Sequence, residues 1–222
     1  MAVPVRRLKI VVPIALGALE LSHPMWSDSD VAAAIRAADG WWLPLHLLLI
    51  AGYAALVRLL RVSSVFARAM LVAFLVCNTA FLAVDGIGVG LLAATDPGEA
   101  DRLWNSALVS ALANLTGAMW AASLLSVAAA QLGGAKTKVV TIGLILTWVL
   151  FLASVAPASV LPLLSRLAAA ATGAWIVYTR GTAGVPAALL VFAAVLHQHV
   201  GAEAALGLLL VTIALARRPE RG

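Results

Sequence analysis

Charged residues are scarce in this chain. Only 11% of its 222 residues are Asp, Glu, Lys or Arg, whereas 63% are hydrophobic. A soluble domain of ordinary composition carries about 25% charged residues, so this chain has too few to cover its own surface. Several apolar stretches reach the roughly 18 residues that a helix needs to cross a bilayer. The composition therefore predicts an all-α integral membrane protein in contact with the lipid bilayer.

Cysteine pairs and several catalytic signatures are also missing. Cys77 is the only cysteine, so an intrachain disulfide is excluded. The sequence has no glycine-rich phosphate loop, no G-x-S-x-G nucleophile motif, no H-E-x-x-H zinc motif and no C-x-x-C pair. The net charge of +5 has a topological explanation, because membrane proteins gather Lys and Arg on their cytoplasmic loops. We therefore expect no nucleic-acid partner.

Apolar stretches divide the chain into membrane-spanning segments. Six of them are expected at residues 8–22, 41–60, 66–92, 104–130, 138–157 and 160–179. A seventh stretch, 184–216, is about 50 Å long as one helix, whereas the hydrocarbon core is about 30 Å thick. Length alone leaves open whether this stretch crosses once or twice. Residues 27–40, with Ser29 as the expected N-cap and Gly40 as the expected stop, predict a short helix on the outer surface.

The distribution of charge selects between these topologies. With the N-terminus inside, the inner side holds Arg6, Arg7, Lys9, Arg58, Arg61, Arg68, Lys136, Lys138 and Arg180. The outer side then holds Asp28, Asp30, Asp39, Asp96, Glu99 and Asp101, with Arg36 and Arg102 as its basic residues. The basic C-terminal tail belongs inside by the same rule, so the last stretch crosses twice. We predict one domain of eight spans over residues 1–222 in the cell membrane, with both termini cytoplasmic and seven spans as the alternative.

This topology brings the ionisable residues of the spans to one depth, near the outer face. His23 ends the first span, Glu20 lies one turn before it, His46 lies about one turn inside the second, and Asp85 lies in the outer half of the third. An ionisable residue within a span is costly and usually faces a partner or a wet cavity. The sequence therefore predicts a pocket formed by His46, Asp85, His23 and Glu20.

Each of these residues also has a structural interpretation. Asp85 is as well explained by an ion pair with Arg166 as by a functional carboxylate, and His46 by a core hydrogen bond. His197, His199 and Glu203 lie at the turn of the last stretch and are a candidate metal site. Their spacing matches no zinc motif, and the same residues could simply face water at the turn.

Three classes of function remain open. A haem b needs two imidazoles at matched depth, which His46 could supply with His197 or His199. A divalent metal with a His and carboxylate cluster could serve a membrane enzyme at the outer leaflet. A transporter, or an accessory subunit with a membrane-protein partner or a second copy of itself, is the third class.

Three short segments of the first 95 residues resemble a recurring pattern in bacterial polytopic membrane proteins of no assigned activity. The segments are "LELSHPMW", "WWLPLHLLLIAGYAAL" and "AFLAVDGIGVG". The resemblance implies that His23, Pro24, His46, Asp85 and Gly86 form one unit.

Overall fold

A computed structural model describes residues 5–24, 30–38, 40–60, 62–133, 138–154, 160–196 and 202–217. Over these residues the chain is helical and has no β-strand, which confirms the all-α class. Four segments are long and apolar enough to cross a membrane: Trp42–Leu59, Val65–Thr95, Ala107–Leu132 and Leu161–Ala194. By length and composition these segments are consistent with a membrane protein whose apolar helices contact a lipid bilayer.

The helices follow the expected apolar stretches with few gaps. The N-terminal part contains α1 (Val5–Leu21), α2 (Val31–Ala37), α3 (Trp42–Leu59), α4 (Val65–Leu82), the π-helix η1 (Ala83–Gly88), α5 (Val89–Thr95), α6 (Pro97–Trp104) and α7 (Ala107–Leu132). The C-terminal part contains α8 (Lys138–Ser154), α9 (Leu161–Arg180), the 3₁₀-helix η3 (Gly181–Gly184), α10 (Val185–Ala194) and α11 (Ala202–Ala216).

Polar caps set several helix starts. The side chain of Asp30 accepts a hydrogen bond from Ala33 N at 2.7 Å and begins α2. The expected cap, Ser29, lies outside the described residues. Ser106 caps α7, so the helix expected over 104–130 in fact begins at residue 107. The segment before it is a separate helix, α6, because Asp96 and Pro97 form a strong start signal of their own.

The last apolar stretch is two helices rather than one. α10 and α11 pack against each other, and α10 also packs against α9 and α7. Gly181 has a φ of 57° at the end of α9, a left-handed conformation that suits glycine and lets the chain reverse. The three C-terminal helices therefore form two successive hairpins.

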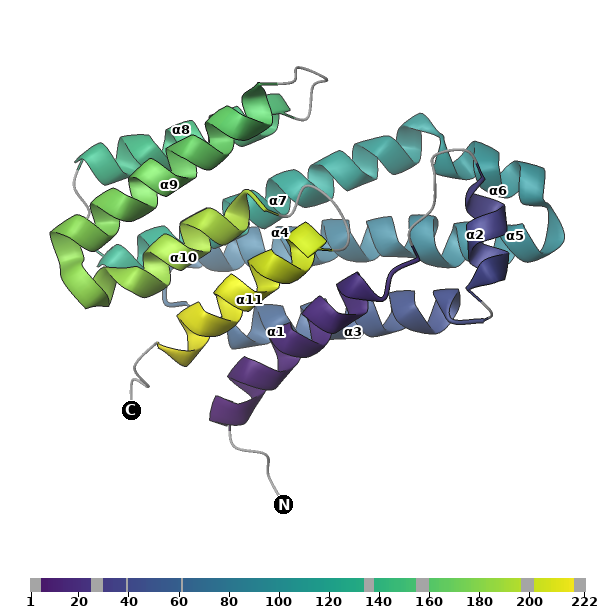
Figure 1. Cartoon of the computed structure of the whole chain (residues 1–222), viewed down its shortest axis with the longest axis horizontal. Helices are drawn as coiled ribbons and strands as arrows, with labels where there is room; N and C mark the ends of the chain where they lie inside the picture. Colours follow the sequence, from purple (N-terminus) through teal and green to yellow (C-terminus); the bar gives the residue numbers. More distant parts are fainter. Residues whose placement is uncertain are drawn as a thin grey trace.

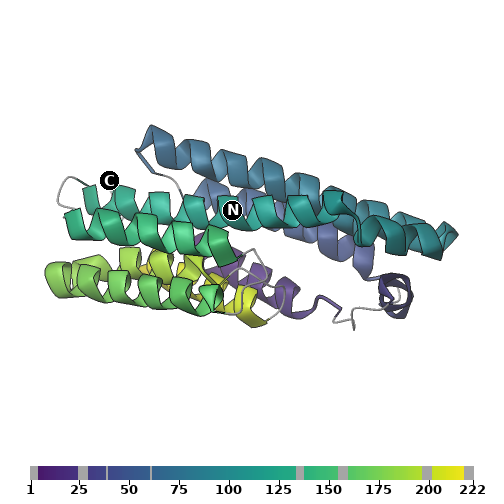
Figure 2. The same ribbon diagram turned by 90° about the horizontal axis from the view of Figure 1, so that it is seen from above.

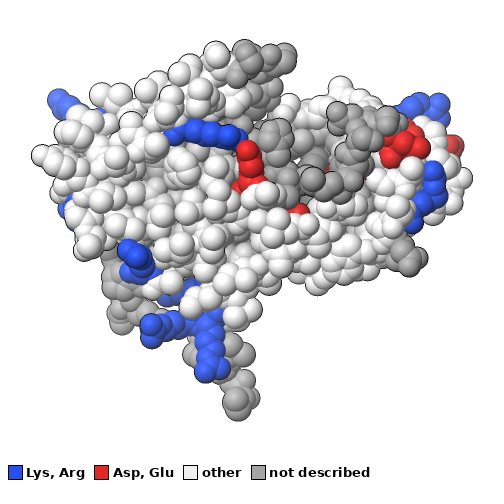
Figure 3. Space-filling view, viewed as in Figure 1, with Lys and Arg blue, Asp and Glu red and all other residues white. Residues whose placement is uncertain are grey.

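The helices give the molecule two distinct ends. Helices α3, α4 and α7 extend toward the end where α2, α5 and α6 lie, and η3, which joins α9 to α10, lies at the other (Figure 1). Seen from above, α2 again lies at the far end from the C-terminal helices (Figure 2). On the face shown in Figure 3, acidic side chains gather mainly at the end with α2 and α6, and the surface between the ends carries few charges.

Aromatic residues form the centre of the core between α3, α4 and α7. Tyr53, Phe74 and Trp120 are each 1% exposed. Their ring centroids lie 5.1 to 6.0 Å apart, in tilted and edge-to-face arrangements typical of buried aromatic groups. This packing fixes α3 against α4 and so fixes the relative positions of the polar residues nearer the end of each helix.

Candidate functional site

His46 lies in the second turn of α3 and is fully buried, with 0% of its surface exposed. Its Nδ1 atom is 2.7 Å from the backbone oxygen of Trp42, one turn earlier. A carbonyl oxygen can only accept, so Nδ1 carries the hydrogen of the neutral ring. The lone pair of His46 is therefore on Nε2.

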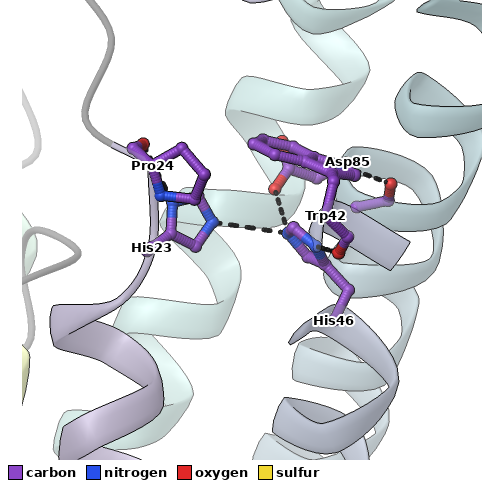
Figure 4. A network of polar contacts seen from close by, with 6 residues as sticks. His23, Pro24, Trp42, His46 and Asp85 are labelled. Atoms are coloured by element: carbon purple, nitrogen blue, oxygen red, sulfur yellow. Dashed lines mark hydrogen bonds and ion pairs between the residues drawn. The ribbon is translucent and has the colours of Figure 1, made fainter. Parts of the chain in front are cut away.

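Two other ionisable groups face this nitrogen. His23 Nε2 lies 3.4 Å from His46 Nε2, and Asp85 Oδ2 lies 4.0 Å from the same atom. The two imidazoles meet edge to face, with centroids 5.2 Å apart. Figure 4 shows His23 and Asp85 approaching His46 from different sides. One acceptor nitrogen is thus shared by two groups that can each carry a proton.

A π-helix places Asp85 in this cluster. Residues 83–88 form η1 in the middle of an otherwise α-helical segment, and Asp85 and Gly86 are its buried residues. Trp42 Nε1 donates a 2.7 Å hydrogen bond to the carbonyl oxygen of Gly86, which fixes η1 to α3. π-Helical turns are rare and are frequent at functional sites. The structure thus uses an uncommon backbone conformation where the buried carboxyl group lies.

Asp85 has unused hydrogen-bonding capacity. Its side chain is buried, and within the described part of the chain its Oδ1 atom has no hydrogen-bond partner. Most buried polar atoms in proteins are paired, because an orphan costs about 1–3 kcal/mol. A buried carboxyl oxygen that stays unpaired despite this cost is a candidate for a role other than packing.

His23 lies just beyond α1 and is the member of the cluster nearest a helix end. Burial and the neighbouring His46 lower the pKa of His23 from 6.5 to about 4, and a contact between its Nδ1 and the Pro24 carbonyl opposes this shift. The folded protein therefore holds His23 neutral at pH 7.

This depressed pKa predicts a pH dependence of stability. The unfolded chain binds a proton at His23 near pH 6.5 and the folded chain only near pH 4, so stability is complete above pH 6.5 and falls as the pH drops toward 4. We expect a loss of up to about 3 kcal/mol between pH 7 and pH 4. Denaturant unfolding in detergent measures this loss. The His23→Gln variant should show a flatter profile, and an unchanged profile would contradict the assignment.

Glu20 is buried in the same region but bonds elsewhere. The hydroxyl of Tyr53 donates to Glu20 Oε1 at 2.7 Å. Tyr53 lies seven residues after His46, two turns along the same face of α3. The structure thus joins His23, His46 and Asp85 in one cluster, and Glu20 forms a second polar pair with Tyr53. Sequence reasoning missed Tyr53 and Trp42, although their spacing from His46 was the available signal.

The expected ion pair between Asp85 and Arg166 is wrong. Arg166 Nη2 instead bonds both carboxylate oxygens of Glu203, at 2.9 and 2.7 Å. Arg166 is on α9 and Glu203 on α11, and both helices pack against α10, whereas the segment holding Asp85 packs against α3. Glu203, expected as a metal ligand, therefore forms an ion pair with Arg166.

The pair between Arg166 and Glu203 should contribute little to stability. The two side chains are 34% and 37% exposed, and ion pairs open to solvent contribute about 1 kcal/mol or less. We expect Arg166→Gln to lower the free energy of unfolding by about that amount, and less in high salt. Arg102→Gln is the matched control, because its pair with Glu99 is more exposed, at 72% and 48%. A loss of several kcal/mol for Arg166→Gln would contradict this prediction.

The described residues test only part of the cofactor predictions. His197 and His199 lie outside the described residues, so the metal site expected there stays a prediction. Among the described residues no group of three or more His, Cys, Asp or Glu side chains is arranged to hold a metal ion. The haem expected between His46 and His197 or His199 also stays a prediction, since the latter two lie outside the described residues. In the described part of the chain the rings next to His46 are those of His23 and Trp42, with centroids 5.2 and 4.6 Å away.

Comparison with known protein families, curated proteins and solved structures finds no match for this chain. The assignment of a function therefore depends on the chemistry of the site itself.

Proposed function

We propose that the chain is a cell-membrane protein of eight spans whose His23, His46 and Asp85 take up a proton from the outer side and transfer it into the membrane. The eight spans are α1, α3, the α4–α5 segment and α7 to α11, with both termini cytoplasmic. The positive-inside distribution supports this orientation. The acidic Asp96, Glu99 and Asp101 then lie outside, at the end near the cluster.

One observation carries the proposal, namely that both neighbours of His46 approach the same nitrogen. Nδ1 keeps its hydrogen on the Trp42 carbonyl, while Nε2 faces His23 at 3.4 Å and Asp85 at 4.0 Å. Histidine is the side chain best suited to accept and release a proton near neutral pH. Chains of His and Asp within membrane spans are typical of proton relays.

The transfer proceeds in two steps that conserve protons. Protonated His23 donates its Nε2 hydrogen to His46 Nε2, which makes His46 a cation with hydrogens on both nitrogens. His46 then gives the Nε2 hydrogen to Asp85 Oδ2 and returns to the neutral form with Nδ1–H still bonded to Trp42. The second step requires the 4.0 Å gap to close to hydrogen-bond distance, about 2.6–3.2 Å. The Oδ1 atom of Asp85 has no hydrogen-bond partner among the described residues, which supports a movement of this carboxyl group toward His46.

Infrared difference spectroscopy tests the transfer. When the pH of membranes containing the protein is lowered, we expect a protonated-carboxyl band that is missing in Asp85→Asn. His46→Gln keeps a polar side chain but cannot relay a proton, so it should abolish this band or slow its appearance. Glu20→Gln is the control and should keep the Asp85 band.

Two results would overturn the proposal. One is a band that depends on Asp85 but appears equally in His46→Gln, since the carboxyl group would then be protonated by another route. The other is a stoichiometric metal or haem in the purified protein that is lost in His46→Gln, since Nε2 would then be a ligand.

A further inference from the structure

A cavity separate from the histidine cluster lies between α4, α7 and α8. Its volume is about 720 Å³, within the roughly 300–1,000 Å³ of small-molecule sites. Its lining is mainly apolar and comes from the first turns of α4, the second half of α7 and most of α8. Phe66 and Ile145, at its side, are 65% and 57% exposed. In a membrane these residues face lipid, so a ligand can enter sideways from the bilayer.

Polar groups are distributed unevenly along this cavity. Ser63 and Ser64 stand at the start of α4, and Thr141 lies in the first turn of α8. Trp148 lies deeper in α8, and within the described part of the chain its buried Nε1 atom has no hydrogen-bond partner. Helical side chains lean toward the N-terminus of their own helix. For the Trp148 side chain this direction is toward the start of α8, where Thr141 lies.

The polar end is also the positively charged end. Two helices, α4 and α8, begin there, and the unpaired N–H groups of a first helical turn carry partial positive charge. Arg68 lies one turn into α4, and Lys138 is the first residue of α8. Both side chains are exposed. Neither residue lines the cavity itself, but each lies about one helical turn from a lining residue, Ser64 or Thr141, so an anionic group at this end would lie near two cations and two helix N-termini.

We propose that this cavity binds an anionic phospholipid of the membrane. The phosphate lies at the end formed by Ser64, Arg68 and Lys138. An ester carbonyl accepts from Trp148 Nε1, and one acyl chain fills the apolar part between α7 and α8. The proposal requires the chain to be in a membrane but does not depend on the proton transfer, because none of the cavity residues belongs to the histidine cluster.

Thermal unfolding of delipidated protein in a neutral detergent tests this site. A lipid that binds only the folded protein raises its apparent Tm. At about ten times its Kd, phosphatidylglycerol should raise the Tm by about 3 °C or more. Phosphatidylcholine should raise it less, because it lacks net charge. Glycerol phosphate alone should have no effect, because it lacks the acyl chain.

Three variants and one control variant locate the binding. The double variant R68Q/K138Q should lose the difference between the two lipids, and Trp148→Phe should weaken the response to both. Ala130→Phe fills the cavity and should abolish the response, whereas Ala111→Phe, on an exposed position of the same helix, should retain it. If Ala130→Phe does not fold, the response of R68Q/K138Q to the two lipids alone tests the site.

Equal stabilisation of the unaltered protein by both lipids would overturn the proposal. A full response in R68Q/K138Q would do the same, and so would stabilisation by glycerol phosphate alone. These results would leave the histidine cluster untouched, and failure of the proton transfer would leave this site untouched.

Discussion

Among substitutions that add a single methyl group, Gly86→Ala is expected to disrupt the site most. A Cβ atom at this position would overlap the ring of His46, which packs directly on the Gly86 backbone. The ring cannot move away freely, because Nδ1 is bonded to Trp42 and Trp42 is bonded to Gly86. Overpacking of this kind costs about 1–3 kcal/mol. We expect a loss of stability of that size together with loss of the Asp85 infrared band.

Gly88→Ala is the matched control. It lies in the same π-helix, but an added Cβ would make only ordinary contacts, at 3.5 Å to Ala83 O and 3.8 Å to a Leu103 methyl group. Alanine is favoured over glycine in a helix by about 0.5–1 kcal/mol, so this variant should be as stable as the unaltered protein or slightly more so. Equal behaviour of the two variants in chemical denaturation would contradict the packing of His46 on Gly86.

Replacing Tyr53 with phenylalanine is expected to have the second large effect. The change removes only a hydroxyl group, but that hydroxyl donates to the buried Glu20. Glu20 is 4% exposed, so its carboxyl oxygen cannot readily bond water once the tyrosine hydroxyl is removed. Leaving such a group unpaired costs about 1–3 kcal/mol, and more for a charged group. Denaturant unfolding should show a loss of about 2–3 kcal/mol.

The control for this prediction is Tyr178→Phe, because Tyr178 is 82% exposed. Removing its hydroxyl group should change the free energy of unfolding by less than about 0.5 kcal/mol. A double-mutant cycle with Glu20→Leu then measures the pair itself. The double variant should be more stable than the sum of the single losses predicts, since no orphan remains. Strict additivity would show that the two side chains do not interact.

Helix register explains why the sequence could predict the cluster. The apolar stretches give each helix a start and a direction, and these place His23, His46 and Asp85 near the same depth. The predicted pocket also included Glu20, whereas in the structure His23 and Asp85 approach His46 and Glu20 bonds Tyr53 instead. Depth, however, says nothing about position around the bundle. Arg166 has a suitable depth for Asp85, but its helix packs against α8 and α10 instead of α3.

The π-helix could not be predicted from the sequence. Its formation depends on contacts between helices, notably the hydrogen bond from Trp42 to the Gly86 carbonyl. The hydropathy of residues 83–88 is the same for an α-helix as for a π-helix. The pairing of Glu20 with Tyr53 was missed for a related reason, because a tyrosine in an apolar helix is most simply interpreted as packing.

Nitrogen-15 NMR of the histidine rings in the purified protein tests the central claim most directly. The resonances of His46 can be assigned by their loss in His46→Gln. At pH 7 we predict a neutral ring with its hydrogen on Nδ1 and an unprotonated Nε2, the atom that His23 and Asp85 both face. A ring with its hydrogen on Nε2, or a doubly protonated ring at pH 7, would contradict the account, because His46 would then have no lone pair available to receive a proton from His23.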